Sequence, residues 1–367
     1  MSSNHILAAV LPIHPVYLHT LDPFAIEFTD GIGIRWYGLA YLTGFLLGYW
    51  SILWLSRRST ILLKTADLSD FVFSVALGCI LGGRIGYCLF YDPTLFITIF
   101  PDLPYWGVLA VNHGGMASHG GMIGIVIACY IFARKRGIPV PHLFDLTIFG
   151  ATLGIFFGRI ANFINGELVG RPASENYWLA VKFPQDILSW PKYNPEKLAD
   201  LAPVVKQLGV APSEWLQWIA LQRPQVDSLL QRIVDEVQNN NILVRTSLEP
   251  LLTPRYPSQL FAAFLEGLLL FLFLFWVWRK PRKPGVITGL FFSGYAIVRI
   301  IGEFYRRPDL HLGYQFLSLT RGQWLSVGLF AVGIASSLYW RSRPSEPLGG
   351  WRDGARPEHS AEEEEQD

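Results

Sequence analysis

Apolar residues dominate seven stretches of this chain, each about as long as a helix that crosses a membrane. A helix needs about 20 such residues to span the hydrocarbon layer of a bilayer. The stretches are residues 33–55, 71–91, 115–133, 143–165, 258–278, 286–305 and 323–340. This pattern predicts an all-α polytopic membrane protein with seven transmembrane helices.

The polar connections divide the chain into four parts. Residues 1–170 hold a short interfacial segment and the first four helices. Residues 171–257 are a mixed segment with proline-rich turns, four tryptophans and an amphipathic helix pair near 213–238, which we expect to form an extracytoplasmic head against the lipid interface. Residues 258–340 hold the last three helices. Residues 341–367, with the acidic run 362–365, are predicted to be a disordered cytoplasmic tail.

Basic residues indicate which ends of the helices face the cytoplasm. They follow every odd-numbered apolar stretch, at 57–58, 134–136, 279–283 and 341–343. Cytoplasmic loops are enriched in lysine and arginine. The pattern therefore predicts an N-terminus outside and a C-terminus in the cytoplasm.

Composition agrees with a membrane protein and excludes several functions. Only 16% of the residues are charged, against about 25% in soluble domains. A net charge of +1 gives no sign of nucleic-acid binding. The three cysteines lack metal-ligand spacing, and neither HExxH nor GxSxG occurs. We expect no metal and no cofactor, and a nucleophile supplied by a second substrate.

Two arginines interrupt apolar stretches, Arg159 within ATLGIFFGRIANFING and Arg299 within GLFFSGYAIVRIIGEFY. Such a residue costs roughly 2.5–3.5 kcal/mol at a bilayer centre on insertion scales. Arg159 shares a helix face with Asn162, and Arg299 shares one with Glu303. Both arginines indicate either an anionic ligand or structural ion pairs.

Further polar residues fall at the same outer ends of the predicted helices, namely Tyr37, Arg84, His119, Glu167 and Gln259. Two arginines can bind a phosphate through bidentate hydrogen bonds. The convergence therefore favours a site for an anionic lipid, with a histidine available as acid or base. Simpler interpretations stay open: an intrahelical Arg299–Glu303 pair, an ion pair or lipid-headgroup contact at Arg84, and an interfacial His119.

Several motifs resemble the prolipoprotein diacylglyceryl transferase family of bacteria. The most specific is GRIANFINGE at 158–167, followed by Gly170-Arg171. The others are RWYG at 35–38, GGRIGY at 82–87, HGG at 119–121, PSQL at 257–260 and RIIGEF at 299–304. Their order and spacing match the family over nearly all of the membrane part.

The resemblance implies a transferase of the bacterial plasma (inner) membrane, with its active site toward the outer leaflet. It would move the diacylglyceryl group of phosphatidylglycerol to the lipobox cysteine thiol of prolipoprotein signal peptides, releasing glycerol 1-phosphate. By resemblance, Arg159 and Arg299 would hold the phosphate and His119 would be the base, with Tyr37 as a further catalytic residue that orients the site. The remaining residues would shape the site and bind lipid: Asn162, Glu167, Gly170, Gln259 and Glu303.

Two positions depart from the family pattern. The family has histidine before Pro-Ser-Gln and a glutamate shortly after it, whereas this chain has Tyr256 and Ala262, with Glu266 one turn deeper. A transporter of an anionic lipid or metabolite is the alternative function. It would show an internal repeat and polar groups near the bilayer midplane, and the sequence shows neither.

Overall fold

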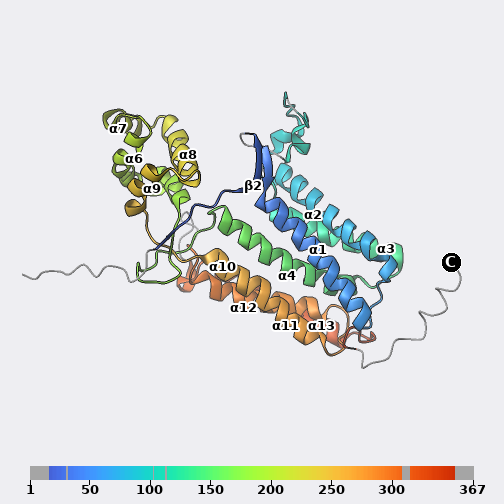
Figure 1. Cartoon of the computed structure of the whole chain (residues 1–367). Coiled ribbons are helices and arrows are strands. Elements are labelled where there is room, and N and C mark those ends of the chain that lie inside the picture. The colour runs from blue at the N-terminus through green and yellow to red at the C-terminus, as the bar shows by residue number, and fades with distance from the viewer. Residues whose placement is uncertain (1–15, 30–31, 102, 112–113, 308–314, 352–367) are drawn as a thin grey trace, which may run out of the picture. The chain divides into compact units, whose positions relative to one another are not determined.

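The computed structural model describes residues 16–29, 32–101, 103–111, 114–307 and 315–351, which are mostly helical (Figure 1). The long helices are α1 (Trp36–Arg58), α2 (Leu68–Phe90), α3 (Ser118–Arg136), α4 (Val140–Ile164), α12 (Val286–Glu303) and α13 (Arg321–Ser342). Between α4 and α12, the short α10 (Ser258–Ala262), the π-helix η8 (Ala263–Leu269) and α11 (Leu270–Trp278) follow one another directly.

Five helical segments are long and apolar enough to cross a membrane: Trp36–Arg58, Thr65–Phe90, Val140–Ile164, Ser258–Trp278 and Val286–Glu303. Only 22% of the apolar window of α1 is buried within the structure, so most of that helix presents apolar side chains outward. An apolar surface of this kind suits lipid contact. The predicted third and seventh spans coincide with α3 and α13, and their crossing of the membrane stays a prediction.

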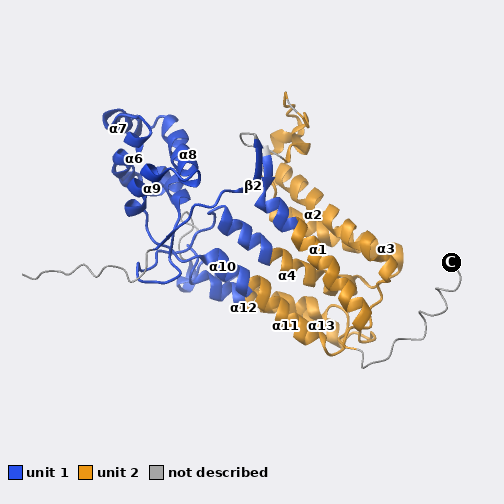
Figure 2. Ribbon diagram, in the orientation of Figure 1, with its two compact units in different colours: residues 1–41, 156–265, 298–324 blue, residues 42–155, 266–297, 325–367 orange. Residues whose placement is uncertain are grey.

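The chain forms two compact units (Figure 2). Unit 1 comprises residues 1–41, 156–265 and 298–324, and unit 2 comprises residues 42–155, 266–297 and 325–367. The predicted division at 170, 257 and 340 differs from these boundaries and stays a prediction about function and topology.

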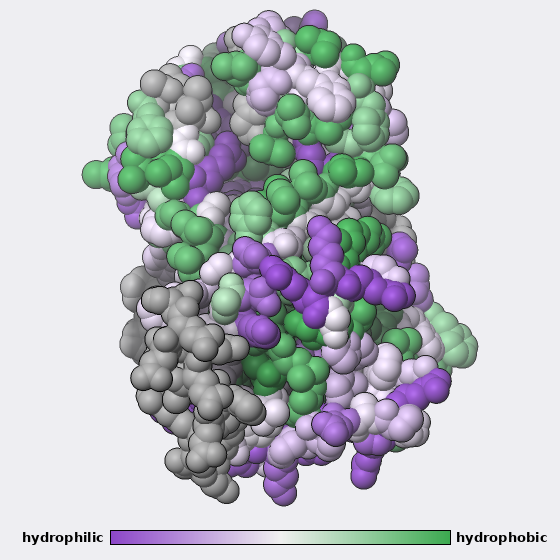
Figure 3. All heavy atoms as spheres, turned by 90° about the vertical axis from the view of Figure 1, so that its right-hand side faces the viewer, coloured by the Kyte–Doolittle hydropathy of each residue, from purple (hydrophilic) through white to green (hydrophobic). Residues whose placement is uncertain are grey.

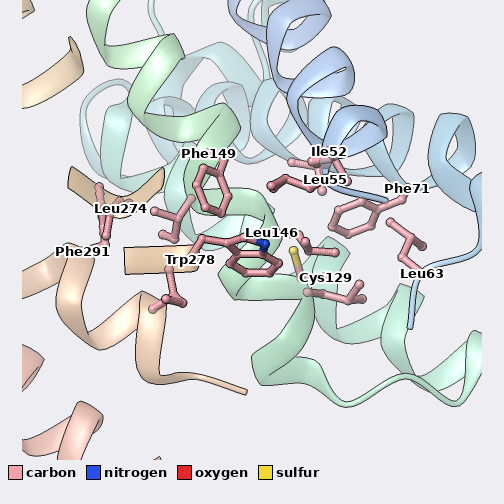
Figure 4. Close-up of a cluster of buried hydrophobic side chains, with 14 of the residues drawn as sticks. Ile52, Leu55, Leu63, Phe71, Cys129, Leu146, Phe149, Leu274, Trp278 and Phe291 are labelled. Carbon is pink, nitrogen blue, oxygen red and sulfur yellow. The ribbon is translucent and has the colours of Figure 1, made fainter. Parts of the chain in front are cut away.

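Unit 2 has a core of aliphatic and aromatic side chains from its long helices (Figure 4). Leu55, Leu143, Leu146 and Phe149 are fully buried in it. Trp278 also packs there and donates its indole N–H to Ser59 Oγ at 2.9 Å. A buried indole N–H needs a hydrogen-bond partner, so this bond allows Trp278 to be buried in the core.

Two local features stabilise helix ends in unit 2. Asp145 on α4 accepts hydrogen bonds from the main-chain N–H of Gly285 and of Thr288 and from Thr288 Oγ1, each at 2.7 Å. These bonds satisfy free N–H groups at the start of α12, as a capping carboxylate does. At the C-terminal end of α3, Gly137 adopts φ +65° and ends the helix.

Helices α2 and α3 approach each other at glycine. A Cβ atom added at Gly124 would lie 1.9 Å from the carbonyl oxygen of Gly78, and one at Gly120 would lie 2.3 Å from that of Gly82. The two backbones are therefore in direct contact, as glycine permits between membrane helices.

Basic residues lie at the ends of α1 and α3, as Arg57-Arg58 and Arg134-Lys135-Arg136. Arg136 forms ion pairs with Asp67 at 3.0 Å and with Asp70 at 3.2 Å. Figure 3, in which the right-hand side of Figure 1 faces the reader, shows a group of hydrophilic side chains among hydrophobic ones.

Unit 1 contains a separate helical cluster within the segment predicted as a head (Figure 1). Its helices are α5 (Trp190–Tyr193), α6 (Ala202–Gln207), α7 (Pro212–Ala220), α8 (Gln225–Gln238) and α9 (Ile242–Leu248). The predicted amphipathic pair corresponds to α7 and α8. Trp215 is fully buried at the centre and donates its indole N–H to the carbonyl oxygen of Leu198 at 2.8 Å.

Short strands complete unit 1. Strand β1 (Tyr17–Leu18) pairs in parallel with β4 (Val181–Lys182), and β2 (Phe24–Thr29) pairs in antiparallel with β3 (Ile32–Arg35), which leads directly into α1. The Arg35 guanidinium lies 4.6 Å from the centre of the Phe24 ring. This contact lies within the hairpin, at the residue directly before α1 begins.

Candidate active site

The end of α4 places Glu167 in unit 1. The N–H of Gly166 donates to the carbonyl oxygen of Phe163, and the N–H of Glu167 donates to that of Asn162, both at 3.0 Å. Gly166 adopts φ +67°. These two bonds and the left-handed glycine define a Schellman motif, which ends a helix sharply. The sequence Asn-Gly-Glu thus turns Glu167 back toward the last turn of α4.

Tyr37, Asn162 and Glu167 form a connected group of hydrogen bonds. The Tyr37 hydroxyl donates to Glu167 Oε2 at 2.9 Å, and it accepts a hydrogen bond from Asn162 Nδ2. Asn165 Nδ2 donates to Glu167 Oε1 at 3.3 Å. The positive charge of Arg159 acts on the Tyr37 hydroxyl from the same helix face as Asn162. The start of α1 and the end of α4 therefore meet at one polar cluster.

Helix α10 donates hydrogen bonds to two successive main-chain carbonyl groups that follow α4. Gln259 Nε2 donates to the carbonyl oxygen of Glu167, and Ser258 Oγ donates to that of Leu168 at 2.9 Å. Leu168 has φ +52°, a strained value for leucine. Both donor side chains are buried, so their hydrogen bonds stabilise this tight turn from the protein interior.

Arg299 and Glu303 form the expected ion pair on α12, with 3.3 Å between Nη2 and Oε2. Glu303 also accepts a hydrogen bond at Oε1 from Thr320 Oγ1 at 2.9 Å. The main-chain N–H of Thr320 in turn donates to Gln323 Oε1 at 2.9 Å. The Glu303 side chain is only 6% exposed. The carboxylate is therefore fixed from two sides and restricts where the Arg299 guanidinium can lie.

Three chain segments are joined beside these residues. Gly170 bridges to Arg306, the N–H of Arg171 donates to the carbonyl oxygen of Tyr305 at 2.9 Å, and the N–H of Tyr256 donates to that of Arg171 at 3.0 Å. A Cβ atom at Gly170 would lie 2.3 Å from the carbonyl oxygen of Tyr256. Gly170 thus permits the close approach of backbones that brings the ends of α4, α10 and α12 together.

Next to this junction, Asp186 accepts hydrogen bonds from Arg255 Nη2 at 2.7 Å and from Arg307 Nη1 at 3.3 Å. Arg255 Nη1 also donates to the carbonyl oxygen of Gly170 at 3.2 Å. Burial and the nearby charge of Arg255 lower the pKa of Arg307. One carboxylate therefore holds two cations at the base of the head.

His19 anchors the last turn of α4 from the N-terminal side. Its Nε2–H, in the neutral tautomer, donates to the carbonyl oxygen of Phe163 at 2.7 Å, and its ring packs against the rings of Phe163 and Phe183. Burial lowers the pKa of His19 to about 4. The imidazole is thus neutral at physiological pH and supports the backbone next to Asn162.

His119 and Arg84 belong to unit 2, whereas the residues above belong to unit 1. His119 is the second residue of α3 and is exposed to the surroundings. Arg84 is buried on α2, and among the residues that the structure describes its hydrogen-bond partners are all main-chain carbonyl oxygens. The prediction of an ion pair or headgroup contact at Arg84 is therefore wrong. The carbonyl groups that bind it carry no side-chain signature in the sequence.

The geometry of unit 1 suits recognition of an anion. Two arginines contribute to it from different helices: the charge of Arg159 on α4 acts on the Tyr37 hydroxyl, and Arg299 on α12 pairs with Glu303. Tyr37 adds a hydroxyl that is already fixed. Groups held in place before a ligand arrives lower the cost of organising the site.

Comparison with known proteins identifies the family. The family model described as prolipoprotein diacylglyceryl transferase matches residues 23–339. The chain belongs to this family. Over 343 residues it is 50% identical to the phosphatidylglycerol–prolipoprotein diacylglyceryl transferase of Bdellovibrio bacteriovorus. The matched region covers 92% of this chain and 97% of that protein. The proteins of the same name from Rhodospirillum rubrum and Azospirillum brasilense are 36% and 37% identical, each covering 89% of this chain and 94% and 96% of those proteins.

As a member of the prolipoprotein diacylglyceryl transferase family, the chain is a transferase, and the family resemblance drawn from its motifs is confirmed. At the departures from the family pattern, the Tyr256 ring packs edge-on against Tyr177 and Tyr305. Ala262 ends α10, and Glu266 is fully buried in η8, within 3.4 Å of the Tyr295 hydroxyl.

Sequence reasoning missed Thr320 and Asp186. Thr320 contacts Glu303 from the start of the last helix, and Asp186 joins Arg255 and Arg307 across 69 and 121 residues of chain. Neither threonine nor aspartate stands out in its own polar segment, so only the fold reveals the contact.

Proposed function

We propose that this protein transfers the diacylglyceryl group of phosphatidylglycerol to the cysteine thiol of a prolipoprotein lipobox. The observation that carries the proposal is the similarity, over more than nine tenths of both chains, to a relative named for that substrate pair. The thiol sulfur attacks the glyceryl carbon next to the phosphate, and the carbon–oxygen bond breaks. The phosphate keeps the bonding electrons and leaves as glycerol 1-phosphate, and a thioether forms.

Arg159 and Arg299 are the proposed phosphate ligands. Negative charge on the leaving phosphate grows as the carbon–oxygen bond breaks, and fixed guanidinium groups stabilise that charge. The positions of Arg159 beside Tyr37 and of Arg299 beside Glu303 support this role. Asn162, Glu167, Gly170 and Gln259 would shape the lipid site around them.

His119 is the proposed base for the thiol. A free cysteine thiol has a pKa near ~8.5, so little of it is thiolate at neutral pH. A histidine within reach could take the proton as the sulfur attacks. The position of His119 in the first turn of α3, where it is exposed, supports this proposal.

The proposed topology has seven spans, an N-terminus outside and a C-terminus in the cytoplasm of a bacterial inner membrane. The head between the fourth and fifth spans would then be extracytoplasmic. Support comes from the basic residues that follow every odd-numbered span. On this topology the polar cluster of unit 1 would lie toward the outer leaflet, where phosphatidylglycerol and the signal peptide are both accessible.

The arginine roles are tested by reconstituting Arg159→Ala and Arg299→Ala variants with phosphatidylglycerol and a lipobox peptide. We expect each variant to remain folded and to lose nearly all thioether formation, followed by mass spectrometry. Lysine at either position should restore little, because it lacks the planar fork of the guanidinium. Arg57→Ala, at the basic end of α1, is the control. Full activity in an alanine variant would remove that arginine from the site, and lipid movement without thioether formation would favour a transporter.

The base is tested separately with His119→Gln. We expect turnover to fall by ~10²–10⁴-fold with lipid affinity largely kept. Raising the pH toward the pKa of the thiol should recover part of the rate, because the substrate then supplies its own thiolate. Loss of lipid binding, or no recovery at high pH, would make His119 structural.

A further inference from the structure

Arg84 uses its entire guanidinium on the main chain. Its Nε donates to the carbonyl oxygen of Val108 at 2.7 Å. Its Nη1 donates to those of Gly114 at 2.6 Å and Gly115 at 2.8 Å, and its Nη2 donates to those of Gly107 at 2.6 Å and Ala110 at 3.2 Å. A guanidinium carries five N–H donors. All five are therefore taken, and none remains for a lipid phosphate or a carboxylate.

The chain that Arg84 binds is shaped to meet it. Gly114 and Gly115 have φ +85° and +82°, values that residues with a Cβ rarely adopt. A Cβ atom at Gly115 would lie 2.6 Å from Arg84 Nη1 and 2.7 Å from the Tyr87 ring. The Tyr87 ring also lies 5.8 Å from the guanidinium carbon of Arg84. The glycines and the aromatic ring thus form a cradle in which the arginine fits.

This cradle leads directly into the helix that carries His119. The N–H of Ala117 donates to the carbonyl oxygen of Gly83, the residue before Arg84, at 2.9 Å. Helix α3 begins at Ser118, and the backbone of Gly120 lies against that of Gly82. The chain is thus held by α2 immediately before His119 and immediately after it.

We propose that Arg84 is a positioning residue that sets the location of His119 by organising residues 107–111 and 114–117. The proposal rests on the proposed role of His119 as base. Arg84 has no contact with substrate in this account and acts only through the backbone. Five charge-assisted hydrogen bonds to one side chain make the turn rigid, so the first turn of α3 has a single position.

The test is Arg84→Lys, with Arg134→Lys on α3 as the control. Lysine keeps the charge but offers three donors from one nitrogen, so it cannot bind both halves of the turn. Displacing a catalytic group by about 1 Å can cost about 10²-fold in rate. We expect kcat to fall by about that factor, with KM for phosphatidylglycerol nearly unchanged. A raised KM with kcat kept would instead indicate that Arg84 binds lipid, and would overturn the proposal.

A double variant separates positioning from general damage. If Arg84 acts through His119, Arg84→Lys combined with His119→Gln should lose little more activity than His119→Gln alone, because both remove the same step. Losses that multiply would show that Arg84 acts independently of His119. Gly115→Ala is a milder variant, because it keeps the buried charge and disturbs only the cradle. It should give the same kcat effect and the same lack of additivity, and multiplying losses here would also overturn the proposal.

Hydrogen exchange gives a readout that does not depend on catalysis. In Arg84→Lys, amides of residues 114–121 should exchange at least about tenfold faster than in Arg134→Lys, because the turn loses its anchor. Unchanged exchange would overturn the positioning role. If exchange rises while His119→Gln keeps full turnover, the turn is held as proposed and the assignment of His119 as base is what fails.

Discussion

Replacing Asp186 with alanine should destabilise the base of the head more than any other single carboxylate change in that region. The Asp186 side chain is 5% exposed and that of Arg255 is 7% exposed. Arg255 donates twice to Asp186 Oδ2, at 2.7 and 3.2 Å, and Arg307 donates to Oδ1 at 3.3 Å. Without the carboxylate, two nearby cations would face each other with no counter-charge.

The magnitude follows from burial. Removing one partner of a buried ion pair costs about 3–5 kcal/mol, because a buried charge is left without compensation. The Arg307 contact adds less than the Arg255 contact, because the Arg307 side chain is more exposed, at 22%, and its distance to Asp186 is longer, at 3.3 Å. We therefore expect a loss of about 4 kcal/mol, which is nearly a thousandfold change in the local opening equilibrium.

Amide hydrogen exchange of the purified full-length protein measures this opening. Protection should fall most at residues 184–189, which contain Asp186, and at 255–257. Asp227→Ala, on an exposed position of α8, should change protection by less than about 0.5 kcal/mol. The double variant Asp186→Leu with Arg255→Met should recover much of the loss, because it removes the buried cation as well. A loss below about 1 kcal/mol, or no recovery in the double variant, would refute the reasoning.

Two further predictions concern pH and topology. Because the folded state keeps the pKa of His19 at about 4, below the ordinary 6.5, only the unfolded state takes up a proton between these values; stability should be full above pH 6.5 and fall by up to about 3 kcal/mol as the pH drops to 4. Thermal unfolding in detergent checks this, and His19→Gln should flatten the pH dependence. A cysteine at Asn239 should be labelled from outside intact cells, whereas one at Ser345 should react only after permeabilisation, with the native cysteines replaced in the parent. The reverse labelling pattern would overturn the proposed orientation.

Hydropathy predicted the helices best where apolar runs are long. The fourth stretch, 143–165, corresponds to α4 at Val140–Ile164, and the sixth, 286–305, to α12 at Val286–Glu303. The fifth, 258–278, has the right ends but contains the π-helix η8. In a π-helix the main-chain hydrogen bonds span five residues in place of the four of an α-helix, and this change does not alter the apolar content of the segment. The hydropathy pattern could therefore not predict it.

The polar site divides along similar lines. Arg159 and Arg299 stood out because charge within an apolar stretch is costly, and Arg299–Glu303 followed from helical spacing. The fate of Arg84 could not be predicted, because its partners are carbonyl groups that every residue has. The Asp186 contacts depend on segments far apart in the chain that only the fold brings together.

The glycine contact between α2 and α3 has a consequence for how mutational screens of this protein should be interpreted. At Gly78, Gly82, Gly120 and Gly124, even a methyl group would overlap a backbone atom of the other helix. Backbone atoms cannot rotate aside as a side chain can, so alanine is expected to be as intolerable there as a much larger residue. A saturation screen for viability would thus score these positions alongside the arginines. Intolerance confined to charge removal marks chemistry, whereas intolerance to every added atom marks steric exclusion.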